Sequence, residues 1–191
     1  GQYFRYAGAD EVYLLPESLE IDTDPNEWLS KSLLKINDEM IHKISFQNSS
    51  DPKFTLNYDN ESKRWSVLED PEAELKDDAI SDITKRLKDL SFTKILSGEL
   101  SDNSTGRTQL TGLDVALADG NIYSLQVGEN ENADGNHVLS LHMSIQIESD
   151  SPDLRKEMER FNQKTGGRLF EIRSWEAKNL LKKQADLLKE D

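Results

Sequence analysis

A chain of 191 residues can form one large domain or two small lobes, and its 37 acidic and 23 basic residues give a net charge of −14. This negative charge repels phosphate backbones, so nucleic acid is not expected as a partner. The chain has no cysteine, which excludes disulfides, thiolate metal sites and cysteine nucleophiles.

The first 15 residues predict a β-hairpin. Residues 2–6 and 11–15 are rich in aromatic, β-branched and leucine side chains. Gly8 lies between them, where a tight turn needs a backbone angle that glycine adopts easily. We therefore expect the chain to begin in antiparallel sheet.

A tryptophan followed five and six residues later by leucines occurs twice, at residues 28–34 and 175–181. In a helix, such side chains can share one buried side. Residues 24–27 read Asp-Pro-Asn-Glu, with a capping Asp, a Pro at the first helical position and a Glu three residues after the cap. The pattern predicts two equivalent helices and an internal duplication.

Between these segments, alternating apolar residues predict an antiparallel meander of strands at residues 40–46, 54–58 and 64–67. Residues 75–90 carry apolar side chains at helical spacing and predict an amphipathic helix. A further strand is expected at residues 92–96.

The second half of the chain predicts strands at residues 113–117, 122–127, 137–147 and 169–172. Asp119-Gly120 is typical of a hairpin turn between the first two. A short helix should begin at Ser151-Pro152 and end at Gly166-Gly167, and Ser174 should cap the last helix.

Strands that arrive as hairpins and meanders favour antiparallel pairing. The sequence therefore predicts an α+β fold in which antiparallel sheets are covered by amphipathic helices, with an internal duplication. The expected organisation is a first α+β unit at residues 1–97, a linker at 98–109 and a second α+β unit at 110–191. One continuous domain is the alternative.

No residue pattern identifies a catalytic, cofactor or metal site. His42, His137 and His142 lie in or at predicted strands, without the helical spacing of a zinc protease. A Ser–His–Asp arrangement can assemble from distant positions, although no Gly-x-Ser-x-Gly turn occurs. We assign no catalytic residue, cofactor or metal ligand.

The loop containing Asn130, Asn132, Asp134 and Gly135 has the opening spacing of a calcium loop. The twelfth position is Leu141, whereas a calcium loop ends in a bidentate Glu. A hairpin loop without calcium is the favoured interpretation.

The chain has three tryptophans, Trp28, Trp65 and Trp175. Each lies where an apolar run meets a predicted helix or meander, which favours core packing. A stacking platform for sugars or peptides is the alternative interpretation.

Several short motifs, in their order, resemble the bacterial domain-of-unknown-function family 4340. They are Tyr3-Phe4-Arg5, Val12 to Leu15, Trp28 to Lys31 with Leu33-Leu34, Ile41 to Ile44, Arg64 to Val67 with Pro71, and Leu110 to Leu113 with Asp119-Gly120. The resemblance implies a domain outside the cytoplasmic membrane, tethered by an N-terminal transmembrane helix and often encoded beside ABC-transporter components. It implies no established activity.

We therefore expect a non-catalytic extracytoplasmic accessory or binding module, with an ABC-transporter component as the candidate protein partner. The first residues have neither an initiator Met nor a signal-peptide pattern, so the anchor is expected upstream of Gly1 in the full-length protein. The alternative is a hydrolase or small-ligand-binding domain whose site is not visible in the sequence. A large exposed apolar patch would favour the first, and a deep pocket with converging polar groups the second.

Overall fold

The computed structural model describes residues 1–17, 20, 24, 28–48, 52–96, 109–146 and 151–189. The chain divides into two compact units, Gly1–Ser30 and Lys31–Asp191. In the first unit, β1 (Gln2–Phe4) pairs antiparallel with β2 (Tyr13–Leu15). Gly8 in the turn has a φ of 82°, so the predicted hairpin is confirmed.

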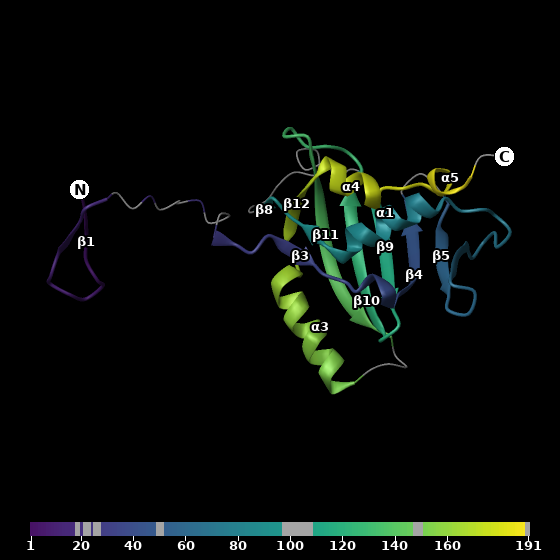
Figure 1. Cartoon of the computed structure of the whole chain (residues 1–191), viewed down its shortest axis with the longest axis horizontal. Helices are drawn as coiled ribbons and strands as arrows, with labels where there is room; N and C mark the ends of the chain where they lie inside the picture. Colours follow the sequence, from purple (N-terminus) through teal and green to yellow (C-terminus); the bar gives the residue numbers. More distant parts are fainter. Residues whose placement is uncertain are drawn as a thin grey trace. The chain divides into compact units, whose positions relative to one another are not determined.

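The second unit is built on one eight-stranded antiparallel sheet (Figure 1). In spatial order its strands are β6 (Arg64–Val67), β5 (Phe54–Asp59), β4 (Ile41–Gln47), β9 (Leu110–Leu117), β10 (Asn121–Gly128), β11 (Asn136–Ile145), β12 (Leu169–Arg173) and β8 (Lys94–Leu96). The meander predicted from residues 40–67 and the hairpin through Asp119-Gly120 are confirmed.

Short helices accompany this sheet. They are the 3₁₀-helix η2 (Asp38–Met40), α1 (Asp77–Lys88), α3 (Pro152–Thr165), α4 (Ser174–Leu180) and α5 (Gln184–Leu187). A small separate pair is formed by β3 (Ser32–Leu34) and β7 (Leu90–Ser91). Helices α1 and α4 lie over one face of the sheet, and α3 runs beside the lower part of β11 (Figure 1).

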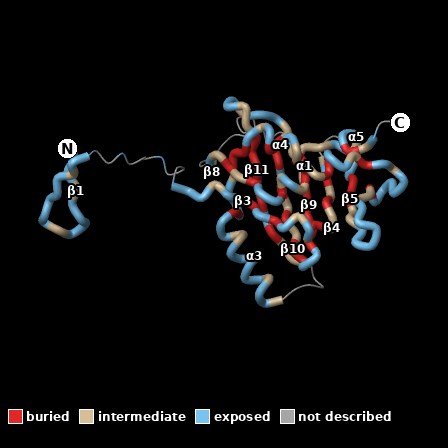
Figure 2. Tube along the Cα trace, in the orientation of Figure 1, coloured by how far each residue is buried: buried red, intermediate tan, exposed pale blue. Residues whose placement is uncertain are grey.

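The apolar core lies against one face of the sheet, and buried residues are concentrated in its strands (Figure 2). Successive residues of a strand point to opposite faces, so every second residue reaches the core. Leu113, Val115 and Leu125 are buried, and the register pairs Leu125 with Leu113. Helix α1 adds Ile83 and Leu87 to the same cluster. The opposite face carries mainly polar side chains, which include Ser45, Asp114, Ser124, Gln126 and His142.

The predicted fold class is wrong, because the structure is mostly β. Among the described residues, strands account for 40% and helices for 25%, and a single large sheet replaces the expected helix-covered sheets. The helices are too short to dominate the architecture, since α4 has 7 residues and α5 has 4. Alternation in the sequence identified most strands of the large sheet, but it did not reveal that strands from both halves join one sheet.

The helix predicted to begin at Trp28 does not form, and with it the internal duplication is lost. Residues 32–34 form β3, whose Leu34 is paired with Leu90 and buried. Trp28 is 69% exposed, whereas Trp175 lies in α4. The paired leucines are buried in extended backbone against β7, so their helical spacing was coincidental. Residues 25–27, which suggested the helix start, lie outside the described part of the chain.

The two predicted units at residues 1–97 and 110–191 contribute strands to the same sheet. β4 from the first pairs with β9 from the second, with Ile44 opposite Val115. Most of the predicted linker, residues 98–108, lies outside the described residues.

Helix α3 completes the hydrogen bonding of β11 along the edge that β12 leaves unpaired. The Asn162 side chain donates to the Met143 carbonyl oxygen at 2.8 Å and accepts from the Met143 N–H at 2.9 Å. β12 pairs with β11 only over residues 136–139. The Asn162 amide therefore takes the place of a neighbouring strand, which protects this stretch of backbone from unpaired exposure.

Replacing Asn162 with Ala should lower the free energy of unfolding by about 1–3 kcal/mol, because two backbone groups of Met143 lose their partner. Urea unfolding measures the change. Gln163→Ala, at an exposed position of the same helix, is the matched control and should change stability by less than about 0.5 kcal/mol. Equal effects of the two substitutions would contradict this role of Asn162.

Candidate functional site

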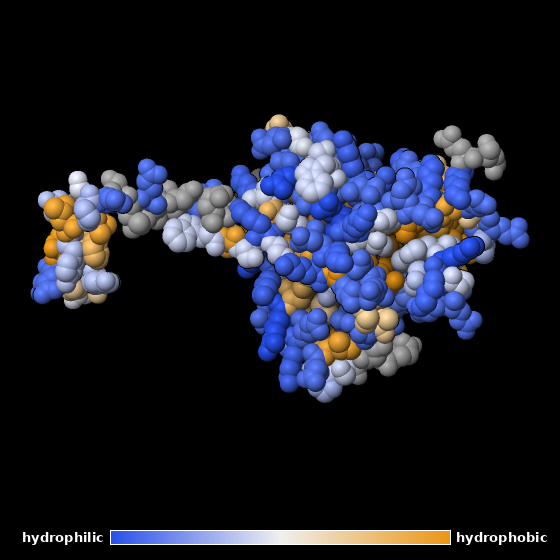
Figure 3. Space-filling view, in the orientation of Figure 1, coloured by the Kyte–Doolittle hydropathy of each residue, from blue (hydrophilic) through white to orange (hydrophobic). Residues whose placement is uncertain are grey.

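The hairpin of the first unit exposes apolar side chains on one of its faces. Tyr3 is 71% exposed, Val12 60% and Leu14 59%. Tyr3 and Leu14 are directly opposite each other in the register, and Val12 precedes Leu14 by two residues. We call these three residues the hairpin face, and Figure 3 shows apolar surface on this unit.

The other face of the hairpin holds its own strands together. The rings of Phe4 and Tyr13 are stacked with centroids 5.2 Å apart, and Tyr6 meets Phe4 edge-on at 5.6 Å. Such aromatic pairs across strands contribute to hairpin stability. A two-stranded hairpin is nonetheless only marginally stable by itself, because it has no second layer in which to bury its apolar side chains. The hairpin face is therefore a surface suited to docking.

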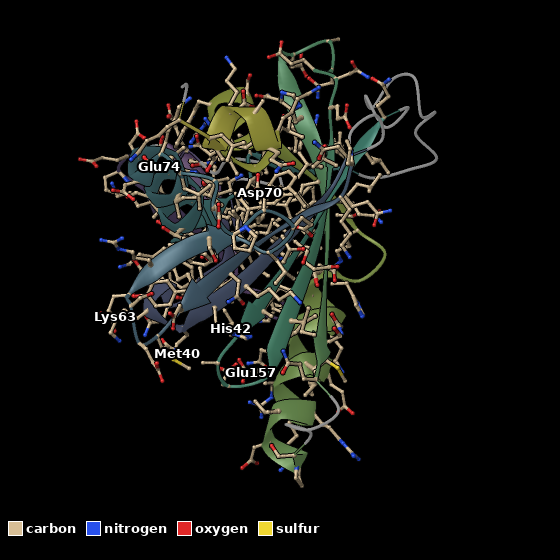
Figure 4. The ribbon with its side chains drawn as sticks, turned by 90° about the vertical axis from the view of Figure 1, so that its right-hand side faces the viewer. Met40, His42, Lys63, Asp70, Glu74 and Glu157 are labelled. Carbon is tan, nitrogen blue, oxygen red and sulfur yellow. The ribbon has the colours of Figure 1, made fainter. Side chains whose placement is uncertain are left out.

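A second candidate lies at the corner of the sheet between η2, the β5–β6 hairpin and α1. This depression of ≈ 480 Å³, which we call the corner pocket, is lined by Asp38, Glu39, Ile41, Tyr58, Asn60, Lys63, Trp65 and Thr84. In Figure 4, Lys63 and Met40 project at this corner of the molecule. Trp65 also packs against the hydrophobic core, as predicted from the sequence.

The loop considered for calcium is closed by its own side chains. The Asn132 side-chain oxygen accepts from the N–H groups of Asp134 and Asn136, both at 3.0 Å. The Asn132 amide nitrogen donates to the buried carboxylate of Glu171 at 2.8 Å, and the Asn136 amide donates to the same carboxylate at 3.1 Å. The oxygen of Asn132 that would bind a cation is therefore directed to the backbone.

Ser174, Glu131 and His137 come together at one end of β11 and β12, but in the wrong order for a catalytic triad. The Ser174 hydroxyl donates to Glu131 Oε1 at 2.6 Å, and His137 Nε2 lies 3.8 Å from the same oxygen. In a triad the imidazole lies between the hydroxyl and the carboxylate, so that it can remove the hydroxyl proton. Here the carboxylate lies between them, and the arrangement does not activate Ser174.

The three histidines are not brought together. His137 is buried, with Nδ1 2.8 Å from the Gly128 carbonyl oxygen, and His142 is exposed on β11. His42 lies at an irregularity between β4 and β9, and its Nδ1 is buried without a hydrogen-bond partner. Among the described residues, no group of three or more His, Cys, Asp or Glu side chains is placed to hold a metal ion.

Trp175 takes part in the contact between helices α1 and α4. Its ring is 52% exposed, and the Arg86 guanidinium lies 4.2 Å from the ring centroid in a cation–π arrangement. Arg86 also forms an ion pair with the buried Glu176 at 3.3 Å. The exposed Trp175 ring thus covers the contact between α1 and α4.

We expect millimolar calcium to leave the melting temperature unchanged, because the loop at residues 130–141 lacks the closing carboxylate and Asn132 is occupied by backbone donors. Thermal melts with and without calcium measure this. A rise of several degrees that disappears on replacing Asp134 would overturn the interpretation.

The environment of His42 predicts a loss of stability in mild acid. Burial, followed by the positive charge of Lys43, lowers the pKa of His42 below its ordinary value of 6.5. The unfolded chain then binds more protons than the folded chain below about pH 6.5, so stability falls as the pH drops from there toward the lower folded pKa. Above this range the contribution of His42 to stability is fully present.

His42→Gln should therefore reduce the loss of unfolding free energy between about pH 7.5 and pH 5.5, measured by urea unfolding at each pH. His142→Gln, at an exposed position of β11, is the matched control and should retain the wild-type loss. The same pH dependence in wild type and His42→Gln would show that His42 is not responsible.

A family model for a domain of unknown function, DUF4340, matches residues 1–114, which include the hairpin face, the corner pocket and strand β4. No curated protein and no solved structure matches the chain. No helix among the described residues is long and apolar enough to span a membrane.

Proposed function

The chain belongs to the DUF4340 family of domains of unknown function, and we propose that it is a non-catalytic accessory module that works by binding a partner protein. The observation that carries this proposal is the hairpin face, where Tyr3, Val12 and Leu14 are each more than half exposed. Exposed apolar groups of this kind are typical of interaction sites. Binding a partner would bury them and stabilise a hairpin that is weak alone.

The proposed setting is the outer side of the cytoplasmic membrane, with an anchor upstream of Gly1 and an ABC-transporter component as the partner. This rests on the resemblance described from the sequence. Aromatic residues such as Tyr3 are enriched among the residues that contribute most to the binding free energy of protein interfaces. The net charge of −14 favours a partner surface with basic residues around its apolar centre.

The alternative is a hydrolase or a small-ligand-binding domain, and the geometry gives less support to the hydrolase. The cluster most similar to a hydrolytic site, Ser174 with Glu131 and His137, places the carboxylate where the base should be. The corner pocket contains aromatic and polar side chains but no paired nucleophile and base.

Affinity purification of the full-length, anchored protein from its own membrane tests the proposal. Transporter subunits should be recovered with the wild type, and Leu14→Asp should reduce their recovery by about 10-fold or more, because a charge would enter an apolar interface. Leu68→Asp is the matched control, since Leu68 is 56% exposed on the other unit, and it should recover the subunits as the wild type does.

Recovery that is equally insensitive to Leu14→Asp and Leu68→Asp would contradict a role for the hairpin face. A partner-free enzyme activity that one polar substitution abolishes would contradict the non-catalytic assignment. Thermal melts of both variants should match the wild type within about 1–2 °C, because each substitution is at an exposed position.

A further inference from the structure

We propose that the corner pocket binds a neutral oligosaccharide, a function separate from the partner binding of the hairpin. The pocket is assembled from three segments that are distant in the sequence. Asp38, Glu39 and Ile41 come from η2 and the start of β4, Tyr58 to Trp65 from the β5–β6 hairpin, and Thr84 from α1. All three segments belong to the unit Lys31–Asp191.

The floor and wall of the pocket are apolar and aromatic. Ile41 is buried beneath it, and the rings of Tyr58 and Trp65 lie with centroids 5.2 Å apart at an angle of 50°. A sugar ring has one face rich in carbon-bound hydrogens, which packs against aromatic rings of this kind. The volume of ≈ 480 Å³ lies in the ordinary range of small-ligand sites.

Several polar groups line the rim of the pocket. Among the described residues, the Tyr58 hydroxyl, the Trp65 indole N–H and the side chains of Glu39 and Asn60 have no hydrogen bond or ion pair, and the Lys63 ammonium attracts the Asp59 carboxylate without forming an ion pair. These groups include both donors and acceptors, as sugar hydroxyls require. A purely apolar ligand would remove them from water without replacing their hydrogen bonds, which is unfavourable.

The charges at the rim favour a neutral ligand. Asp38 is paired with Lys88 at 3.0 Å, which leaves the Glu39 carboxylate and the Lys63 ammonium as charges of opposite sign. A phosphorylated ligand would have to approach Glu39 against the net charge of −14 of the whole chain. A ligand that carries hydroxyls and no charge meets neither difficulty.

Lys63 provides an independent indication of function. It is the only described residue other than glycine with a positive φ, at 58°. In this left-handed conformation a glycine would avoid the steric penalty of a Cβ atom. The preceding turn is already fixed by Asp59, which accepts from the Glu61 N–H at 2.9 Å and the Ser62 hydroxyl at 2.7 Å. The chain thus places a lysine side chain at the pocket in a conformation that costs stability, as is common at functional sites.

The test uses the full chain with Trp28→Phe and Trp175→Phe, which leaves Trp65 as the sole tryptophan. Its fluorescence is followed during titration with cellobiose, maltose and diacetylchitobiose. At least one of these neutral disaccharides should give a saturable change, with a dissociation constant on the order of 1 mM because the pocket is open. No saturable change with any of the three would overturn the proposal.

Lys63→Gly in the same background separates binding from folding. Because glycine relieves the left-handed strain, the melting temperature should stay equal or rise, while disaccharide affinity should fall by about 5-fold or more. Lys53→Ala, at a lysine that lines the opposite face of the sheet, is the matched control and should bind as the background does. Affinity unchanged by Lys63→Gly would exclude the corner pocket as the binding site, whatever the outcome for the hairpin.

Discussion

An antiparallel sheet with a single apolar layer against it can bury only one of its faces, and the rest of this structure depends on that constraint. Helices α1, α4 and α5 supply the layer, with Ile83, Leu87, Ala177, Leu180 and Leu187 all buried. The buried carboxylate of Glu176 links α4 to α1 and β7, since it accepts from Arg86 at 3.3 Å and from Ser91 at 3.0 Å. The other face keeps serines, Gln126 and His142 because it remains in contact with water.

The functional proposals follow from what this arrangement leaves unburied. Within the hairpin unit, Tyr3, Val12 and Leu14 are each more than half exposed. At the corner pocket, Tyr58 and Trp65 are only partly buried. The two features differ in chemistry. The hairpin face is suited to a protein surface, whereas the polar rim of the pocket is suited to a small hydroxylated ligand.

The regular spacing of apolar residues predicted most strands and helix α1, because burial on one face imposes a period on the sequence. The helix prediction at residues 28–34 was wrong for the opposite reason. Three-residue β3 is too short to show a period, and Leu33 and Leu34 fitted a helix as well as a strand. The sequence also indicated a polar turn before Arg64. It did not indicate the left-handed backbone of Lys63 or the proximity of residues 38–41 to Trp65, because both depend on tertiary structure. The hairpin was predicted, yet its exposed face was not, since apolar residues in a strand are usually buried.

The central claim is that the hairpin face is buried by a partner in the membrane assembly. Hydrogen–deuterium exchange of the amides in β1 and β2 tests it directly, by comparing the purified chain of residues 1–191 with the full-length protein in its own membrane. The account predicts fast exchange in the purified chain, because a lone hairpin opens readily, and strong protection in the membrane. Protection already present in the purified chain, or fast exchange in both, would contradict it.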